Sequence, residues 1–377
     1  MTSKETKKHT KHAKLTKPLG GDFHRQEWGL IGAPCQVISQ LASDLRQKLQ
    51  PHYKIGFLDA AHNDTGYTDQ YDNLFTDNIS YQSISFNRKP APKEYRRYFA
   101  DLNVLIVNGN HFVADRQIVL LDERKKESLS RKLNRLSNVS LILRQTEDQE
   151  IYDFLKPVIS DEVPILNLEE TDKIAEFMIK DMLIPDVFGL VLAGGKSERM
   201  GSDKSKLEYY GKPHAHYTAE LIQAHCNQVF LSYRPDQPVK DIEGFGIMKD
   251  TFLGLGPYGA ILSAFKEFPN KAWLTVACDL PFLDQTSINY LFEHRNPNKL
   301  ATCFHNNETN FPEPLITIWE PKAYPVLLEY LGQAYSCPRK VLINSEVEKL
   351  NLDNQQVLSN ANNKAAYLDA IHTISKK

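Results

Sequence analysis

The chain has 377 residues, of which 41% are hydrophobic and 24% are charged. These proportions are ordinary for a folded globular protein and exclude a disordered or collagen-like chain. Lysine and arginine total 45 and aspartate and glutamate 47, so the net charge of −2 gives no overall attraction to nucleic acid or to an anionic membrane. At about 100–200 residues per domain, the length predicts two domains, each large enough for its own core.

Neither the cysteines nor the apolar runs indicate an extracellular or membrane protein. The five cysteines are widely spaced and form no Cys-x-x-Cys pair, so we expect neither a disulfide framework nor a cysteine-based zinc site. The longest apolar run, residues 187–193, is far shorter than the ~20 residues of a membrane span. No segment has the layout of a secretory signal. We therefore expect a cytoplasmic protein that binds neither nucleic acid nor membrane.

Residues 1–27 are expected to form a flexible basic tail. They contain six lysines and no apolar periodicity. The tail could bind phosphate groups or a partner, or it could be a solvated terminus.

From residue 28 onward, strand-like and helix-like segments alternate. A helix is predicted over 36–49, and Leu129, Leu133 and Leu136 predict another. Thr171 is expected to cap a further helix. Apolar runs predict buried strands at 54–58, 102–107, 118–121 and 139–143. Such alternation is typical of a parallel α/β sheet covered by helices.

The Ile-Pro-Asp segment at 184–186 interrupts this pattern, and we place the domain boundary there. The second half begins with a buried strand over 187–192. Further strands are predicted at 228–233 and 273–278, with a helix over 217–225. The sequence therefore predicts two doubly wound, three-layer α/β domains, spanning 28–184 and 185–377.

The most informative segment is the glycine-rich stretch LAGGKSERMGSDKSKL at 192–207, which directly follows a buried strand. Gly194 and Gly195 let backbone N–H groups approach an anion closely, because no Cβ intervenes. Arg199 and Lys204 add cationic donors for phosphate oxygens. The stretch is neither a Walker A loop nor a GxGxxG fingerprint, so it indicates a nucleotide-phosphate site of another type.

Two carboxylates are candidates for the same site. Asp279 follows the strand predicted over 273–278, and open α/β sheets bind ligands at the carboxyl ends of their strands. A carboxylate there can hold Mg²⁺, which prefers hard oxygen ligands. Asp250 precedes the Gly-Pro-Tyr-Gly segment at 256–259, whose glycines allow close backbone approach. The alternatives are a turn at Asp250 and a helix cap at Asp279, although Asp284 is the better candidate for the cap.

The stretch at 192–207 resembles the LAGGxSxRMGxDKxxL signature of the molybdenum cofactor guanylyltransferases, which are nucleotidyltransferases with a Rossmann-like fold. The resemblance covers roughly 186–377 and implies Mg²⁺-dependent transfer of GMP from GTP to molybdopterin, with release of pyrophosphate. It implies that the catalytic residues are Arg199, Lys204 and Asp279, with Asp279 as the metal ligand. The nucleotide-binding residues that it implies are Leu192, Ala193, Gly194, Gly195, Lys204, Asp250 and Asp279.

The resemblance extends to an acceptor side. Residues 311–315, Phe-Pro-Glu-Pro-Leu, resemble the acceptor-side loop of the family, and 360–362 match its Asn-x-Asn segment. Ser232 departs from the pattern, because some relatives have an asparagine there that contacts the nucleotide. The acceptor-binding residues implied are Pro314, Arg339, Asn360 and Asn362.

Residues 28–183 are similar to the molybdopterin-guanine dinucleotide biosynthesis adaptor family, which has a P-loop fold. If Gly32 is the first Walker glycine, Val37, Ile38 and Ser39 occupy the positions of Gly, Lys and Ser/Thr. We therefore expect no ATPase or GTPase activity in this domain. It could dock the transferase domain, bind a molybdopterin-supplying protein, serve a recipient molybdoenzyme, or be a structural remnant.

Two other readings of the chain stay open. One is a different enzyme of the same fold, either a cytidylyltransferase for molybdopterin or a sugar-phosphate nucleotidyltransferase. Gly194 favours guanine, because the cytidyl relatives tend to have alanine at that position. The other is a non-catalytic carrier of the molybdenum cofactor. The presence of Arg199, Lys204 and Asp279 together favours an enzyme.

Overall fold

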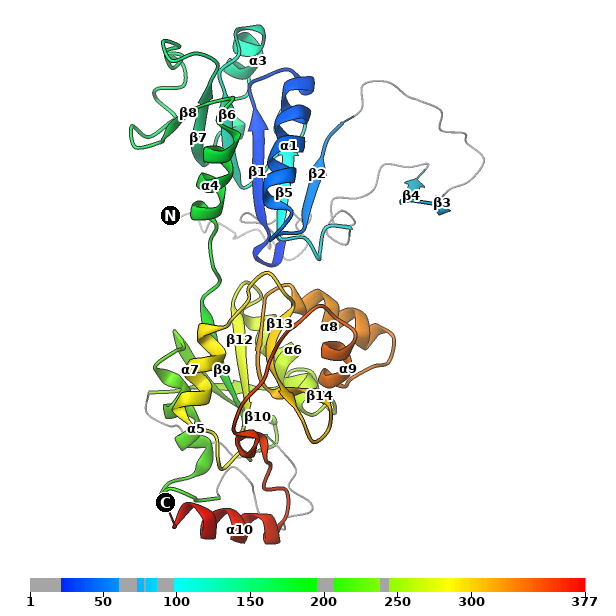
Figure 1. Cartoon of the computed structure of the whole chain (residues 1–377), viewed down its shortest axis with the longest axis vertical. Coiled ribbons are helices and arrows are strands. Elements are labelled where there is room, and N and C mark those ends of the chain that lie inside the picture. The colour runs from blue at the N-terminus through cyan, green and yellow to red at the C-terminus, as the bar shows by residue number, and fades with distance from the viewer. Residues whose placement is uncertain are drawn as a thin grey trace, which may run out of the picture. The chain divides into compact units, whose positions relative to one another are not determined.

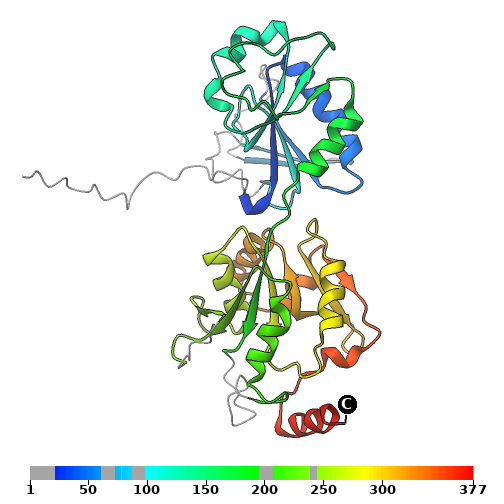
Figure 2. The ribbon, with the colours of Figure 1, turned by 90° about the vertical axis from the view of Figure 1, so that its left-hand side faces the viewer.

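The computed structural model describes residues 22–60, 73–77, 79–86, 98–194, 207–237 and 244–376. The chain divides into two compact units, Met1–Phe177 and Met178–Lys377, a division seven residues before the predicted boundary. Each unit has a central β-sheet with helices packed against it (Figures 1 and 2), so the predicted α/β class is confirmed. Within the described ranges, no helix has the length and apolar composition needed to cross a membrane.

The sheet of the first unit has six strands in the order β2-β5-β1-β6-β7-β8, and every neighbouring pair is parallel. Strands β5 and β6 are buried along their whole length, as expected for a parallel sheet covered on both faces. A separate antiparallel pair consists of β3 (Asn73–Asp77) and β4 (Gln82–Phe86). The six strands are β1 (Gln26–Ile31), β2 (Ile55–Leu58), β5 (Val104–Asn108), β6 (Arg116–Leu120), β7 (Val139–Arg144) and β8 (Ile165–Asn167).

Strand β1 begins inside the segment that was predicted to be the tail. Its first residues, Gln26 and Glu27, are buried, and Glu27 forms an ion pair with buried Arg25. Residues 1–21, which hold the six lysines, lie outside the described residues. The first strand thus starts ahead of residue 28.

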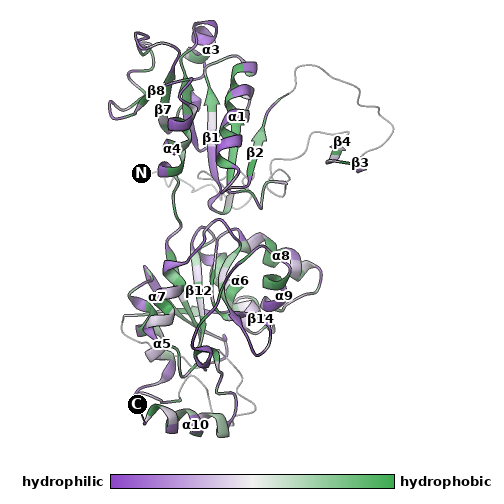
Figure 3. Ribbon diagram, in the orientation of Figure 1, coloured by the Kyte–Doolittle hydropathy of each residue, from purple (hydrophilic) through white to green (hydrophobic). Residues whose placement is uncertain are grey.

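Two helices of the first unit match the prediction and one does not. Helix α1 (Cys35–Leu49) alternates hydrophobic and hydrophilic residues along its length (Figure 3), and α4 (Thr171–Asp181) begins at Thr171 itself. The single helix expected around Leu129, Leu133 and Leu136 is wrong. The chain there forms short turns instead, and the Ser130 hydroxyl donates to the Glu127 carbonyl at 2.8 Å, a bond that competes with helical pairing. The short elements are η2 (Glu123–Lys125), α3 (Lys126–Ser130) and η3 (Leu133–Arg135).

The sheet of the second unit has seven strands in the order β11-β10-β9-β12-β14-β13-β15. Strands β9 to β12 are mutually parallel, whereas β14 is antiparallel to both of its neighbours. The carboxyl ends of β9, β10, β11 and β12 therefore lie at one edge of the sheet. The strands are β9 (Val187–Leu192), β10 (Gln228–Tyr233), β11 (Gly246–Lys249), β12 (Ala272–Ala277), β13 (Ala301–Asn306), β14 (Phe311–Trp319) and β15 (Glu348–Leu350).

Two hydrophobic clusters lie on the two faces of this sheet. Along β9, Val187 and Val191 pack with residues of α5 and α7, whereas Phe188 and Leu190 pack with residues of α6 and α8. This alternation is the period of two that a strand imposes on its side chains. The helices of the unit are α5 (His214–Gln223), α6 (Pro257–Glu267), α7 (Gln285–Glu293), α8 (Ala323–Gly332), α9 (Pro338–Ile343) and α10 (Lys364–Ile374), with the turn η5 (Gln355–Leu358) before the last.

Candidate active site

The turn after β9 lies at the centre of the carboxyl edge of the second sheet. Leu192 ends the strand, and the buried Ala193 donates its N–H to the Ser232 carbonyl at 3.1 Å. A Cβ added to Gly194 would lie 3.2 Å from the backbone nitrogen of Arg234 and 3.4 Å from its Cγ. Glycine at 194 thus fits the close approach of Arg234, which a Cβ would crowd. The predicted residues Gly195, Arg199 and Lys204 lie outside the described residues.

Asp250 follows β11 directly and is fixed by two hydrogen bonds. Its backbone N–H donates to the Tyr233 carbonyl at 2.9 Å, and the Ser232 hydroxyl donates to its Oδ1 at 2.6 Å. Burial raises the pKa of Asp250, while the hydrogen bond from Ser232 and the charge of Arg234 oppose the rise. Ser232, which departs from the family pattern, therefore orients a predicted nucleotide-binding carboxylate.

Asp279 lies two residues beyond the end of β12, on the other side of β9 from Asp250. It is not a helix cap, because Asp284 has that role at the start of α7 and accepts from the Ser287 N–H at 2.8 Å. Burial is the main cause of the shifted pKa values of Tyr209, His214 and Glu313; the negative charge of Asp279 adds to the raised pKa of Tyr209 and Glu313 and opposes the lowered pKa of His214. Asp279 therefore lies within electrostatic reach of all three side chains.

The structure brings the Asn-x-Asn segment to Asp279, although about 80 residues separate them in sequence. The backbone N–H of Ala361 donates to the Asp279 carbonyl at 2.9 Å. The two flanking predicted acceptor residues, Asn360 and Asn362, are exposed. Asn363 caps α10, where it accepts from the Ala366 N–H. The segment thus presents two exposed amides beside the candidate metal ligand.

The segment at 311–315, predicted to be an acceptor-side loop, forms the first half of strand β14 rather than a loop, and its contact with an acceptor stays a prediction. Phe311 and Pro312 pair with β13, and Pro314 is buried. Glu313 on the same strand is 3% exposed, and burial raises its pKa, against the charge of Arg339. Arg339, in α9, donates to Glu313 Oε2 at 3.2 Å. Of the two predicted acceptor-binding residues in this region, Arg339 has a polar side chain that could bind a ligand, whereas Pro314 is buried within strand β14.

Two buried aromatic groups lie close to Asp279. His214, 1% exposed, is bonded through Nε2 to the carbonyl of Leu280, 3.1 Å away, and desolvation lowers its pKa. Tyr209 packs edge-on against the imidazole with ring centroids 4.8 Å apart, and burial raises the pKa of its phenol. These rings pack beside the backbone that carries Asp279.

Sequence reasoning missed two residues at this edge, Arg234 and Gln237. Both follow β10, and Gln237 donates to the Ala193 carbonyl at 3.3 Å. The one available signal was the polar run Ser-Tyr-Arg-Pro-Asp-Gln at 232–237, directly after an apolar strand. The pairing of β9 with β10 determines which of those polar residues contacts the glycine turn. This pairing cannot be read from the sequence.

The corresponding edge of the first unit is organised differently. The connection between β1 and α1 is only Gly32, Ala33 and Pro34, and Gly32 has a φ of 102°. Ile38 is fully buried in the core, and the Ser39 hydroxyl donates to Asp59 at 3.0 Å. A P-loop binds phosphate with a cationic lysine, and this short turn contains none.

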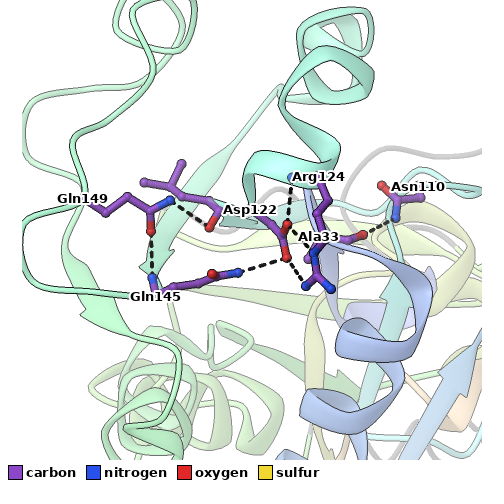
Figure 4. Close-up of polar contacts among 7 residues, drawn as sticks. Ala33, Asn110, Asp122, Arg124, Gln145 and Gln149 are labelled. Atoms are coloured by element: carbon purple, nitrogen blue, oxygen red, sulfur yellow. Dashed lines mark hydrogen bonds and ion pairs between the residues drawn. The ribbon is translucent and has the colours of Figure 1, made fainter.

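Asp122, after β6, is held by groups of its own unit (Figure 4). Arg124 donates from Nε to Oδ1 at 2.9 Å and from Nη2 to Oδ2 at 2.6 Å, and Gln145 donates to Oδ2 at 2.9 Å. The hydrogen bond with Arg124 is the main cause that lowers the pKa of Asp122. This carboxylate is a structural anion. The P-loop-like nature of the first unit remains a prediction.

Comparison with known proteins gives matches for the second unit in particular. Residues 189–349 match the model of the MobA-like NTP transferase domain. A Synechocystis protein named molybdenum cofactor biosynthesis bifunctional protein is 34% identical over 218 residues, which cover 58% of this chain and 62% of that protein. A probable molybdenum cofactor guanylyltransferase of Carboxydothermus hydrogenoformans is 27% identical over 195 residues, covering 50% of this chain and 96% of that protein.

A solved structure from Archaeoglobus fulgidus, described as molybdopterin-guanine dinucleotide biosynthesis protein A, is also similar. It has 20% identity and a TM-score of 0.42, and the match covers 50% of this chain and all of that one. The match to the Synechocystis protein, like that to a second curated relative, spans 62% of the relative's length. The resemblance noted in the sequence is thus confirmed where the family model applies. The similarity to the MobA-like NTP transferase domain thus lies in the second unit, over residues 189–349.

Proposed function

We propose that this chain transfers GMP from GTP to molybdopterin, releasing pyrophosphate and forming a guanine dinucleotide. The observation that carries the proposal is the placement of Asp279 at the end of β12. The turn at Ala193 and Gly194 and the residue Asp250 lie at the same carboxyl edge of the sheet. The backbone carbonyl of Asp279 accepts a hydrogen bond from the Asn-x-Asn segment. A donor nucleotide and an acceptor can therefore meet at one carboxylate.

The proposed reaction is an in-line displacement at the α-phosphorus of GTP. A phosphate oxygen of molybdopterin forms the new P–O bond, the bond to the β-phosphate oxygen breaks, and pyrophosphate leaves. No protein nucleophile is needed, so catalysis rests on positioning and on electrostatic stabilisation. We assign Arg199 and Lys204 to the triphosphate and Gly195 to the nucleotide through its backbone.

The residues at this edge fit a magnesium ion. Asp279 offers a hard carboxylate, and Mg²⁺ often takes only one or two carboxylates, with phosphates and waters as its other ligands. Such a site needs no large protein cluster, and the described ranges hold no group of three or more His, Cys, Asp or Glu suited to a metal. When bound, the ion would neutralise charge between phosphate oxygens, and Asp279 would hold it.

The remaining predicted residues divide between the two substrates. Leu192, Ala193, Gly194 and Asp250 would bind the nucleoside side of GTP. Arg339, Asn360 and Asn362 would bind the anionic phosphate of molybdopterin, with Pro314 in the wall behind them.

We propose that the first unit is not a nucleotide hydrolase and that it serves partner binding. A molybdopterin-supplying protein and a recipient molybdoenzyme are the partners that the proposed reaction calls for. A cytoplasmic location suits this chemistry, and it is supported by the five cysteines, all of which are free thiols.

The test is incubation of the full chain with GTP, Mg²⁺ and molybdopterin, followed by mass detection of the dinucleotide and a pyrophosphate assay. We expect formation of the guanine dinucleotide and a higher rate of pyrophosphate release with GTP than with CTP. Faster release with CTP would overturn the assignment of guanine. Absence of any dinucleotide with either nucleotide would overturn the proposed transfer.

A further inference from the structure

We propose that Arg234 selects the nucleobase, donating two hydrogen bonds from its guanidinium to O6 and N7 of guanine. The inference rests on the proposed function and identifies the side chain that recognises the base at the proposed nucleotide site. It concerns a residue that neither the glycine-rich signature nor the acidic positions include.

The guanidinium of Arg234 has donors to offer. The side chain is 30% exposed, and its Nε lies 3.3 Å from the exposed carboxylate of Asp236. Within the part of the chain that the structure describes, its buried Nε and Nη1 atoms donate no hydrogen bond. Buried donors are almost always satisfied in native proteins, because an unsatisfied one loses its hydration without compensation. A ligand that brings acceptors would satisfy this group.

The stem of Arg234 lies against the glycine turn. The Cβ that Gly194 lacks would meet the backbone nitrogen of Arg234 at 3.2 Å, closer than most Cβ contacts, and its Cγ at 3.4 Å. A side chain at position 194 would therefore press on Arg234 where its side chain begins. Gly194 and Arg234 lie in direct contact, so a substitution at 194 is expected to shift the arginine.

The order of the strands places the base on the Arg234 side of the turn. Asp279 follows β12 and Arg234 follows β10, on opposite sides of β9. If Asp279 anchors the phosphates through its metal, the nucleoside extends from β9 towards β10 and β11, across strands about 4.8 Å apart.

The charges near Arg234 also favour a base over a phosphate. Asp236 lies at ion-pair distance, and the charge of Arg234 acts on Asp250. Two carboxylates would repel a phosphate at this position, but they do not repel a neutral base. Guanine presents two adjacent acceptors, O6 and N7, which match the arginine fork, whereas adenine places an amino donor beside N7.

The experiment measures equilibrium binding by calorimetry with the full chain and Mg²⁺, using GTP, 7-deaza-GTP, ITP and guanosine. 7-Deaza-GTP lacks the N7 acceptor, and ITP keeps O6 and N7 but lacks the 2-amino group. The variants are Arg234→Met, Arg234→Lys and Gly194→Ala, with Lys266→Met as a charge-matched control at the exposed end of α6. Thermal melts establish that each variant is folded.

We expect the unmodified chain to bind 7-deaza-GTP about tenfold more weakly than GTP, the loss of one hydrogen bond to a charged donor. Arg234→Met should bind both nucleotides equally, and Lys266→Met should discriminate as the unmodified chain does. Gly194→Ala should lose the discrimination between GTP and 7-deaza-GTP. Combining it with Arg234→Met should cause no further loss of that discrimination. The penalty for ITP should be the same in the unmodified chain and in Arg234→Met.

Three results would overturn the inference. The first is equal binding of GTP and 7-deaza-GTP by the unmodified chain, and the second is discrimination that survives in Arg234→Met. The third is a loss in Arg234→Met that affects GTP but not guanosine, since this would place the arginine on a phosphate. If any of these results is obtained and the chain still forms the dinucleotide, the inference about Arg234 is wrong but the proposed function is not contradicted. Failure of the unmodified chain to bind GTP at all would overturn both.

Discussion

At the scale of single residues, three aspartates of the second unit have different surroundings. Asp284 satisfies the first turn of α7, and the half-buried Asp250 is bonded to Ser232. Asp279 lies against the segment predicted to bind the acceptor and near two aromatic rings. The surroundings of each carboxylate, rather than its chemistry, separate the helix cap from the proposed nucleotide ligand Asp250 and the proposed metal ligand Asp279.

This division predicts opposite phenotypes for two neighbouring substitutions. Asp279→Asn should lower the rate of pyrophosphate release about 100-fold or more, the cost of removing one preorganised electrostatic group. Asp284→Ala should reduce stability by about 1 kcal/mol through the lost cap and leave the rate unchanged. Steady-state kinetics and thermal melts on both variants check this. Transfer within a few-fold of the unmodified rate in Asp279→Asn would show that Asp279 does not hold the metal.

Asp250 predicts a pH-dependent stability effect. Burial raises its pKa in the folded chain, whereas the unfolded carboxyl titrates near ~3.9. Well below that pH, the carboxyl of Asp250 is protonated in both the folded and the unfolded chain, so burying it costs no stability through its charge. The loss of stability from burying a charged carboxylate grows as the pH rises through the folded-state pKa. Asp250→Asn should therefore raise Tm more at about pH 8 than at about pH 4, while weakening GTP binding. Equal Tm shifts at the two pH values would contradict this account.

At the scale of elements, helix α6 is fixed to the site by a close backbone contact. It follows Gly256, whose φ of 57° suits glycine, and it is buried from Tyr258 to Phe265. A Cβ at Gly259 would lie 2.2 Å from the backbone oxygen of Phe252, in the loop after Asp250. Gly259 thus serves the packing of helix against loop, and Gly256 supplies the positive φ at the start of the helix.

Gly259→Ala should therefore destabilise the protein, although alanine is the better helix former. We expect a loss of about 1–3 kcal/mol, typical of overpacking, because a backbone oxygen cannot move aside as a flexible side chain can. Gly332→Ala, at the end of α8 with open space around its Cβ, is the matched control and should be neutral or stabilising. Denaturant unfolding measures both, and equal effects of the two substitutions would rule out the contact as the cause.

At the scale of the whole molecule, the parallel strands of the two sheets have carboxyl edges of different character. The edge of the second unit presents the glycine turn and two carboxylates, one of them beside exposed amides. That of the first unit has a three-residue turn after β1 and a carboxylate, Asp122, held by Arg124. The second unit therefore has the groups expected of a nucleotide site at this edge, whereas the described turn after β1 in the first unit carries no lysine or arginine.

From this contrast we expect the full chain to release pyrophosphate, and no inorganic phosphate above background, from GTP. Asp122→Asn should leave pyrophosphate release within about twofold of the unmodified chain, far from the 100-fold effect expected at Asp279. Separate phosphate and pyrophosphate assays measure these rates. Phosphate release that Asp122→Asn abolishes would show that the first unit hydrolyses nucleotide.

Local sequence was sufficient for most of the strands and for part of the site. Continuous apolar runs located β5, β7 and β9 within about two residues, because a strand buried on both faces needs little else. The same logic placed Asp279 at a strand end. It failed for Leu129, Leu133 and Leu136, since helical spacing of leucines does not exclude short turns that bury Leu129 and Leu136.

The sequence by itself determined the two α/β domains, the glycine-rich turn and the candidate carboxylates, because these depend on hydrophobic period and on local residue chemistry. The tertiary structure decided that residues 311–315 pair as a strand, that the segment at 360–362 meets Asp279, and that Arg234 lies against Gly194. Each of these is a contact between residues far apart in the chain. Such contacts follow from strand order and register, which the packing of the whole sheet selects and no local pattern records.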